Sequence, residues 1–354
     1  GAHIAKFVKE IELEDLLLEG KIEETQRIVN EFDEKELLTE QDKLIWQIFI
    51  GNLNYHKGEF NKANEIGLQA YQKSLTMGNL RLIIMSISLR FNALLFLGST
   101  FELEDDKEKA EKILESALDE PRTVIEEGET ILRSIKGWFF WSRGEYDIAL
   151  ENVRRSLEYC ENQKWALYVF SLQNLIGHIY EQKGDLELAL SSHKKSLEFS
   201  NGNSFVINLL KGSSYNELGA IYYQQGNLDQ AIESYKKGLE IFEQYDEPLF
   251  YIHMEICWIY NDLIRIFLDK KSSTLTNEFL HRFHKFTENT KNLWFIDWYK
   301  LSEARILKSS LRIRDKAKAE EIFRKLIDTY KELDFRLFTQ AILENCDFYL
   351  AELN

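Results

Sequence analysis

The feature that most constrains this chain is a pattern of small residues that recurs along it. In residues 174–197, Gly177 is followed by an aromatic residue three positions later, by Gly184 seven positions later and by Ala189 twelve positions later. Apolar residues on both sides of Gly184 fall at helical spacing, so we expect two helices that are joined there. Glycine and alanine at a helix crossing let the two backbones approach closely. The stretch therefore predicts a helical hairpin.

The same pattern occurs five times. A glycine precedes an alanine by twelve residues in each copy, and the pairs are Gly51 and Ala63, Gly98 and Ala110, Gly137 and Ala149, Gly177 and Ala189, and Gly219 and Ala231. In the copy of Gly98, an aspartate replaces the turn glycine. Position sixteen after the glycine holds a further packing residue, such as Val153, His193 or Tyr235. Repetition at a period of about 40 residues is typical of a solenoid of helical pairs.

These segments resemble tetratricopeptide repeats. The first-helix motif Leu-Gly-x-x-Tyr of that family is matched at residues 218–222, and a related Ile-Gly-x-x-Tyr occurs at residues 176–180. The glycines are 47, 39, 40 and 42 residues apart, against the usual 34 of the family, so the helices are expected to carry extra turns. In this respect the chain resembles the longer repeats of kinesin light chains and of Rap-type peptide receptors. The resemblance covers roughly residues 44–243.

The resemblance implies an all-α fold, a right-handed α-α superhelix of about seven or eight helical hairpins with a capping helix at the C-terminal end. Only two prolines occur, Pro121 and Pro248, which suits continuous helices. Residues 1–3 look like an expression scar, and residues 4–354 are predicted to form one solenoid domain. Its predicted parts are a degenerate first repeat (4–38), five clear repeats (40–247), two divergent repeats (248–332) and a capping helix (333–354).

Charge and cysteine usage limit the partners and the compartment. The net charge of −15 argues against nucleic acid or an anionic membrane as the main partner, and it favours ligands that carry Lys or Arg. The three cysteines are far apart and odd in number, which indicates reduced thiols and a cytoplasmic protein. The most apolar stretch, residues 82–101, is interrupted by Arg90 and Asn92, so we interpret it as a buried helix and predict no membrane span.

In the family that this chain resembles, the first helix of each hairpin lines a concave groove, at positions three before, one after and four after the packing glycine. The candidate peptide-binding residues at these positions are Asn52, Tyr55, Ser134, Trp138, Trp141, Asn174, His178, Glu181, Asn216 and Tyr223. Amides such as those of Asn174 and Asn216 can bond the backbone of an extended peptide, and tryptophans supply rigid contact area. Two other interpretations stay open: each tryptophan packs into the neighbouring repeat, or the asparagines face water.

Signatures of catalysis are absent from the sequence. It contains no glycine-rich phosphate loop, no G-x-S-x-G and no H-E-x-x-H motif, and the acidic clusters at 102–106 and 126–129 are typical of solvated faces. His281 and His284 are three residues apart but lack a neighbouring third ligand, so they make a weak metal site. We therefore predict no enzyme activity, no cofactor and no metal.

A basic segment, residues 300–325, holds nine basic and four acidic residues. We interpret it as a solvated helical face, with an acidic partner as the alternative, and not as a nucleic-acid site. The sequence thus predicts a scaffold that binds a peptide or protein segment in its groove. The alternatives are a peptide-sensing regulatory domain of a larger signalling or transcription-regulating protein, and a scaffold that assembles through its ends. The sequence does not indicate the oligomeric state.

Overall fold

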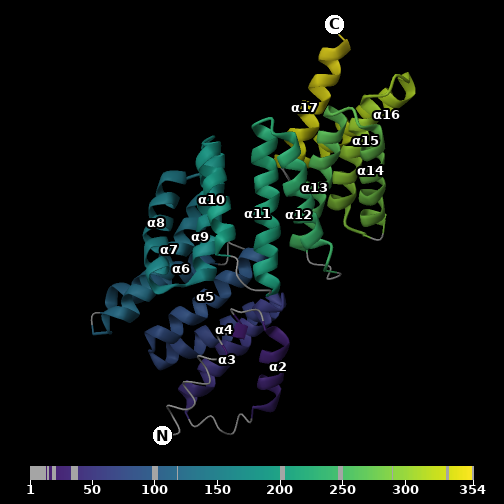
Figure 1. The fold of residues 1–354 in the computed structure, drawn as a ribbon. Coiled ribbons are helices and arrows are strands. Elements are labelled where there is room, and N and C mark those ends of the chain that lie inside the picture. The colour runs from purple at the N-terminus through teal and green to yellow at the C-terminus, as the bar shows by residue number, and fades with distance from the viewer. Residues whose placement is uncertain are drawn as a thin grey trace. The chain divides into compact units, whose positions relative to one another are not determined.

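The computed structural model describes residues 13, 16–17, 21–32, 39–97, 103–117, 119–199, 204–245, 250–288, 290–331 and 335–352. The regular structure in these ranges is helical throughout, so the predicted all-α fold class is confirmed. The chain divides into two compact units, residues 1–214 and 215–354, and the boundary lies inside helix α11, Phe205–Gln224 (Figure 1). The single solenoid domain stays a prediction.

The first unit is a series of helical hairpins. Its helices are α2 (Ile22–Glu31), α3 (Glu40–His56), α4 (Phe60–Met77), α5 (Leu80–Leu97), α6 (Leu103–Ser116), α7 (Arg122–Ser142), α8 (Tyr146–Gln163), α9 (Ala166–Gln182), α10 (Leu186–Glu198) and the first part of α11. Helices α3 and α4, α7 and α8, and α9 and α10 pack as pairs, and α8 also packs on α9. The predicted hairpin of residues 174–197 is thus confirmed as the pair α9 and α10.

Small residues close these hairpins for two different reasons. Gly184 lies between α9 and α10 with a φ of +80°, a left-handed conformation that side chains with a Cβ rarely adopt. Gly177 lies inside α9, and a Cβ added there would be 2.5 Å from Nε2 of His193 on α10. The first glycine therefore permits the turn, and the second permits the close contact between the two helices.

Two parts of the predicted repeat pattern fall on residues outside the described ranges. Gly98, the packing glycine of the third copy, follows the end of α5 and is not described. Most of the degenerate first repeat is also outside these ranges, although Leu13 and Leu17 are buried there against Trp46 and Phe49. The predicted buried helix at residues 82–101 corresponds to α5, whose apolar side chains enter the core. No helix in the described part of the chain is long and apolar enough to cross a membrane.

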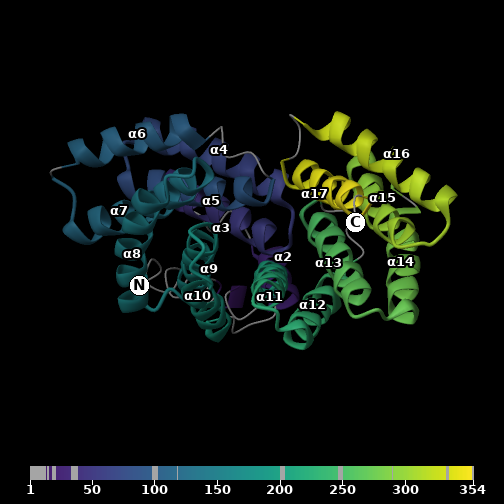
Figure 2. The same cartoon turned by 90° about the horizontal axis from the view of Figure 1, so that it is seen from above.

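The second unit continues the helical pairing, and after Gly238 it does so without glycines. It contains the last part of α11 and α12 (Leu228–Phe242), α13 (Phe250–Asp269), α14 (Ser273–Glu288), α15 (Leu293–Lys308), α16 (Ile313–Tyr330) and α17 (Phe335–Glu352). Successive helices from α13 to α16 pack on one another, and α17 packs on α16 and α15 (Figure 2). Large side chains take over the helix contacts, since Phe279, Phe283, Trp298 and Phe323 are fully buried. Helix α17 corresponds to the predicted capping helix (333–354), of which residues 335–352 are described.

Candidate ligand-binding surface

The predicted groove positions separate into a buried set and a partly exposed set. Residues three before the packing glycine are buried: Ser134 is 2 % exposed, and Asn174 and Asn216 are each 3 % exposed. Residues one after the glycine (Asn52, Trp138, His178) are half-buried. These side chains lie on one face of the first helix of each hairpin, as the helical period predicts. Neighbouring helices cover the edge of that face that holds the residues three before the glycine.

The buried polar side chains bond to one another across helices. Oδ1 of Asn174 lies 2.7 Å from Nδ1 of His193 and accepts a hydrogen bond from Ser214 at 3.3 Å. Ser134 lies 2.6 Å from the hydroxyl of Ser156 on α8. Such bonds satisfy buried polar groups that would otherwise be costly. Ser134 and Asn174 thus serve helix packing, and their contact with a ligand backbone stays a prediction.

In the second unit, Asn216 is bound in a similar way. Its Nδ2 donates a hydrogen bond of 2.6 Å to Oε2 of Glu255 on α13, and Glu255 is itself buried. A carboxylate acceptor makes this bond stronger than one between neutral groups. The equal sequence positions of Asn174 and Asn216 therefore have different partners in the two units.

An aromatic cluster on α7 and α9 brings three predicted residues of the first unit together. The rings of Trp138 and Trp141 are 5.5 Å apart in an edge-to-face arrangement, and the ring of His178 lies 6.4 Å from the first and 5.7 Å from the second. All three are half-buried, and both tryptophans also touch the core around Leu175. Nε1 of Trp141 is buried without a hydrogen-bond partner. The cluster thus combines core packing with an exposed aromatic edge and an unused donor.

Glu181 extends this cluster along α9. It follows His178 by three residues, so the two side chains project from the same side of the helix, and both are half-buried. We refer to Trp138, Trp141, His178 and Glu181 as the α7–α9 surface. Its mixture of aromatic, imidazole and carboxylate groups suits recognition of a segment that carries a basic or aromatic side chain.

The predicted residues on α3 lie in a different environment. Tyr55 is buried, with its ring 5.7 Å from Phe60 and 6.0 Å from Phe96, and burial raises the pKa of its hydroxyl well above the usual value. Tyr55 is thus enclosed by aromatic side chains of neighbouring helices, in contrast to the expected open groove position. Asn52, on the same helix, is half-buried.

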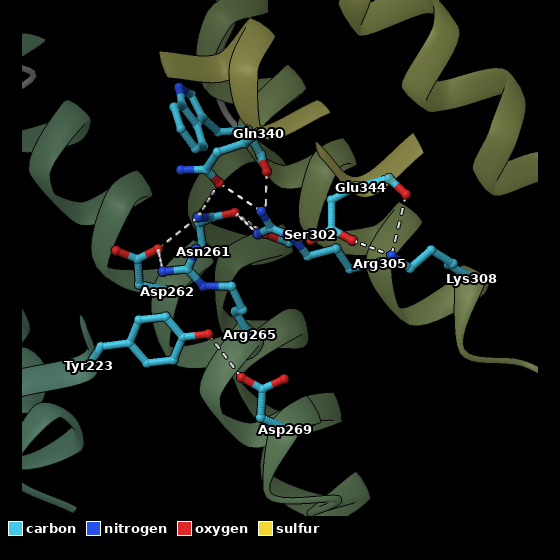
Figure 3. A network of polar contacts seen from close by, with 11 residues as sticks. Tyr223, Asn261, Asp262, Arg265, Asp269, Ser302, Arg305, Lys308, Gln340 and Glu344 are labelled. Carbon is cyan, nitrogen blue, oxygen red and sulfur yellow. Dashed lines mark hydrogen bonds and ion pairs between the residues drawn. The ribbon is translucent and has the colours of Figure 1, made fainter. Parts of the chain in front are cut away.

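Tyr223 lies at one end of a polar network that the sequence did not predict (Figure 3). Its hydroxyl donates to Oδ2 of Asp269 at 2.9 Å, and the guanidinium of Arg265 lies 4.3 Å from the centre of its ring. Arg265 also forms an ion pair of 3.2 Å with Asp262. Burial raises the pKa of Tyr223, and Asp269 acts in the same direction, whereas Arg265 opposes them. The phenol therefore stays protonated and donates to Asp269.

Arg305 on α15 is the centre of this network. It donates to Oε1 of Glu344 at 2.6 Å, to Oε1 of Gln340 at 2.7 Å, and also to Oδ1 of Asn261. Lys308 adds a second ion pair to Glu344 at 2.5 Å. Burial acts to raise the pKa of Glu344, but Arg305 and Lys308 outweigh it and lower the pKa below the usual value. Arg305 thus joins α15 to α13 through the amide of Asn261, and to α17 through the amide of Gln340 and the carboxylate of Glu344 (Figure 3).

These contacts correct one part of the sequence interpretation. Arg305 and Lys308 belong to the basic segment 300–325, which was interpreted as a solvated face, but Arg305 is only 4 % exposed. It is buried because carboxylate and amide partners on α13 and α17 satisfy its donors. The sequence signal was the run Asn261-Asp262 with Arg265 among the apolar residues of one helix, since buried charges require partners.

Comparison with known families supports the repeat assignment. The family described as tetratricopeptide repeat matches residues 168–244, which include all but the first two residues of α9 and the whole of α10, α11 and α12. This match confirms the resemblance at the two copies with the clearest motifs. No curated protein matches the chain.

Solved structures share the fold at low sequence identity. The apo form of the quorum sensor NprR from B. thuringiensis is 14 % identical with a TM-score of 0.61, and the match covers 99 % of this chain and 100 % of the chain in that structure. A Rap protein complexed with Competence and Sporulation Factor is 13 % identical with a TM-score of 0.59, and both chains are fully covered. A signal transduction ATPase with a tetratricopeptide repeat sensor, PH0952 from Pyrococcus horikoshii, is 16 % identical with a TM-score of 0.54, over 100 % of this chain and 48 % of that protein. These similarities establish a tetratricopeptide-type helical fold.

Proposed function

We propose that this chain is a protein-interaction module that binds a peptide or protein segment, with the α7–α9 surface as a principal contact. The observation that carries the proposal is the aromatic cluster of Trp138, Trp141 and His178, which retains an exposed edge and a buried indole N–H without a partner. Tryptophan in such a setting supplies large, rigid contact area at low entropic cost.

The chemistry of the surface favours a segment with a basic side chain. Glu181 provides a carboxylate beside the aromatic cluster, and the chain carries a net charge of −15. A lysine or arginine on the ligand would gain both an ion pair and contact with the indole faces. In support, NprR has been solved in complex with its cognate peptide NprX, and that structure shares this fold with a TM-score of 0.56 at 14 % identity.

A peptide-display selection against the full chain tests the proposal. The double variant Trp138→Leu, Trp141→Leu is compared with the control Trp294→Leu, which removes a half-buried tryptophan from α15 in the second unit. A hot-spot contact is worth about 2 kcal/mol or more, so we expect the double variant to lose about 30-fold or more in affinity for the selected peptides. Circular dichroism confirms that each variant is folded. Equal affinity of the double variant and the control would overturn the proposal.

The runner-up is a sensor that couples ligand binding to an output domain. The sequence of the full gene distinguishes the interaction module from the sensor, because a DNA-binding or ATPase segment in the same protein would favour the sensor. We propose no catalytic role, because the α7–α9 surface lacks a nucleophile with an adjacent base. We also propose a cytoplasmic setting, on the basis of three cysteines that form no disulfide.

A further inference from the structure

Three potential metal ligands converge next to the aromatic cluster of the first unit. His178 and Glu181 on α9 and His193 on α10 each offer one donor atom, and these three atoms all lie within 4.8 Å of one another. Among the described residues, this is the only group of three or more His, Cys, Asp and Glu side chains that could hold a metal ion. The rings of His178 and His193 are 5.2 Å apart.

His193 is held in the form that a metal requires. Its Nδ1 lies 2.7 Å from Oδ1 of Asn174, and because a carboxamide oxygen can only accept, Nδ1 carries the proton. Nε2 is consequently the atom with the free lone pair, and it is fully buried without a hydrogen-bond partner. Metal-bound histidines usually donate their second N–H to an oxygen acceptor in this way.

A comparison of the repeats shows that this arrangement occurs in one copy. The three positions lie one, four and sixteen residues after the packing glycine. In the copy of Gly137 they hold Trp138, Trp141 and Val153, and in the copy of Gly219 they hold Ala220, Tyr223 and Tyr235. A histidine replaces the apolar or aromatic packing residue only where the other two positions also supply metal ligands. Helix packing alone does not require this combination.

We propose that His178, Glu181 and His193 form a binding site for one divalent transition-metal ion of the zinc class. Two imidazoles and a carboxylate are a ligand set that Zn²⁺ accepts, with a fourth position left for water or for a ligand group. Ligands about 2 Å from a tetrahedral zinc ion are roughly 3.3 Å apart, so binding draws the three atoms closer. His178 and Glu181 are half-buried and can rotate toward the fixed ring of His193. Trp138 and Trp141 lie beside His178 and limit the access of water.

The site shares residues with the proposed peptide surface, but it is tested without any peptide. The full chain is treated with a chelator, desalted and titrated with Zn²⁺ in competition with a chromophoric chelator, and with Co²⁺ to record visible absorption. We expect one ion per chain and Co²⁺ bands of a four-coordinate site. Glu181→Gln, a half-buried change that preserves shape, should weaken binding by tenfold or more, and Asn174→Ala should weaken it by about 10- to 100-fold.

The control removes the other histidine pair. His281→Gln with His284→Gln should leave the affinity and the stoichiometry unchanged, because these residues lie on α14 in the second unit. Circular dichroism and the unfolding midpoint establish that each variant is folded. Absence of binding by the folded wild-type chain, equal affinity of Glu181→Gln and His178→Gln with the wild type, or loss of binding in the control would overturn the proposal. Metal binding that persists after loss of peptide binding would separate this site from the proposed function.

Discussion

A Cβ atom placed on Gly137 of α7 would lie 2.3 Å from Cγ2 of Val153 on α8. This contact is the structural reason for the glycine of this hairpin, because Val153, sixteen residues after it, leaves no room for a Cβ. Val153 is fully buried, so its methyl group cannot move into solvent. The backbone of α7 is therefore in direct van der Waals contact with a side chain of its partner helix.

Gly137→Ala is expected to destabilise the protein. Overpacking of this kind costs about 1–3 kcal/mol, which exceeds the gain of roughly 1 kcal/mol from the better helix propensity of alanine. The free energy of unfolding from denaturant titration measures the effect. In the double variant with Val153→Ala the clashing methyl groups are gone, so its loss should be smaller than the sum of the two single losses. Simple additivity would show that the contact is not under steric constraint.

Removal of Arg305 should be far more costly than removal of a surface cation. Arg305→Ala removes a buried guanidinium and leaves the half-buried Glu344 with Lys308 as its ion-pair partner, and breaking a buried pair typically costs about 3–5 kcal/mol. Lys318→Ala is the matched control, since Lys318 forms an exposed ion pair of 3.0 Å with Glu303 from the same segment. Its loss should be below about 1 kcal/mol. Hydrogen exchange of α15 and α17 reports the local effect, and equal protection in both variants would contradict the role assigned to Arg305.

The stability of the first unit should fall in mild acid because of His56. Burial lowers the pKa of His56 from 6.5 to about 4, and its Nδ1 has no hydrogen-bond partner. The unfolded chain therefore binds a proton between pH 6.5 and 4 that the folded chain excludes, so this stability is present above pH 6.5 and is lost as the pH falls toward 4. The shift corresponds to about 3 kcal/mol.

The measurement is the free energy of unfolding at pH 7 and pH 4.5 for the wild type and for His56→Leu. The variant should lose less stability than the wild type over this interval, since it has no imidazole to protonate. His281→Gln, at an exposed position, is the control and should follow the wild type. An identical pH dependence in His56→Leu would rule out the assignment.

Thiol modification should distinguish the three cysteines. Cys346 is exposed, whereas Cys160 and Cys257 are buried. Burial raises the pKa of Cys160 to about 12 and also raises that of Cys257, which suppresses the reactive thiolate. A disulfide exchange reagent should therefore modify one thiol rapidly in the folded protein and three in denaturant. Cys346→Ser should abolish the rapid phase, and rapid modification of two thiols would contradict the buried positions.

The sequence predicted the helical hairpins well because their determinants are local. Gly184 and Gly226 mark turns through their left-handed backbone, and the interval of twelve residues from Gly177 to Ala189 follows from the geometry of one helix returning along another. These constraints act within about 25 residues, so they are visible in a single copy and become unmistakable when copies recur.

The sequence predicted the candidate site less completely. Helical periodicity identifies which side chains share a face of a helix, but it does not show which of them are buried by neighbouring helices. Asn174 and Trp138 both lie on the predicted face of their helices, yet Asn174 is sealed by His193 and Ser214, while Trp138 retains an exposed edge. Likewise, the sequence shows Arg305 only as one member of a basic segment, and the tertiary structure shows that it is paired with Glu344. The sequence by itself therefore determined the all-α repeat architecture and the helix faces. The tertiary structure decided which polar side chains are buried and which partners they bond. Burial and pairing depend on helices about 20–40 residues away in the chain, and local rules of backbone conformation or helix propensity do not reach that far.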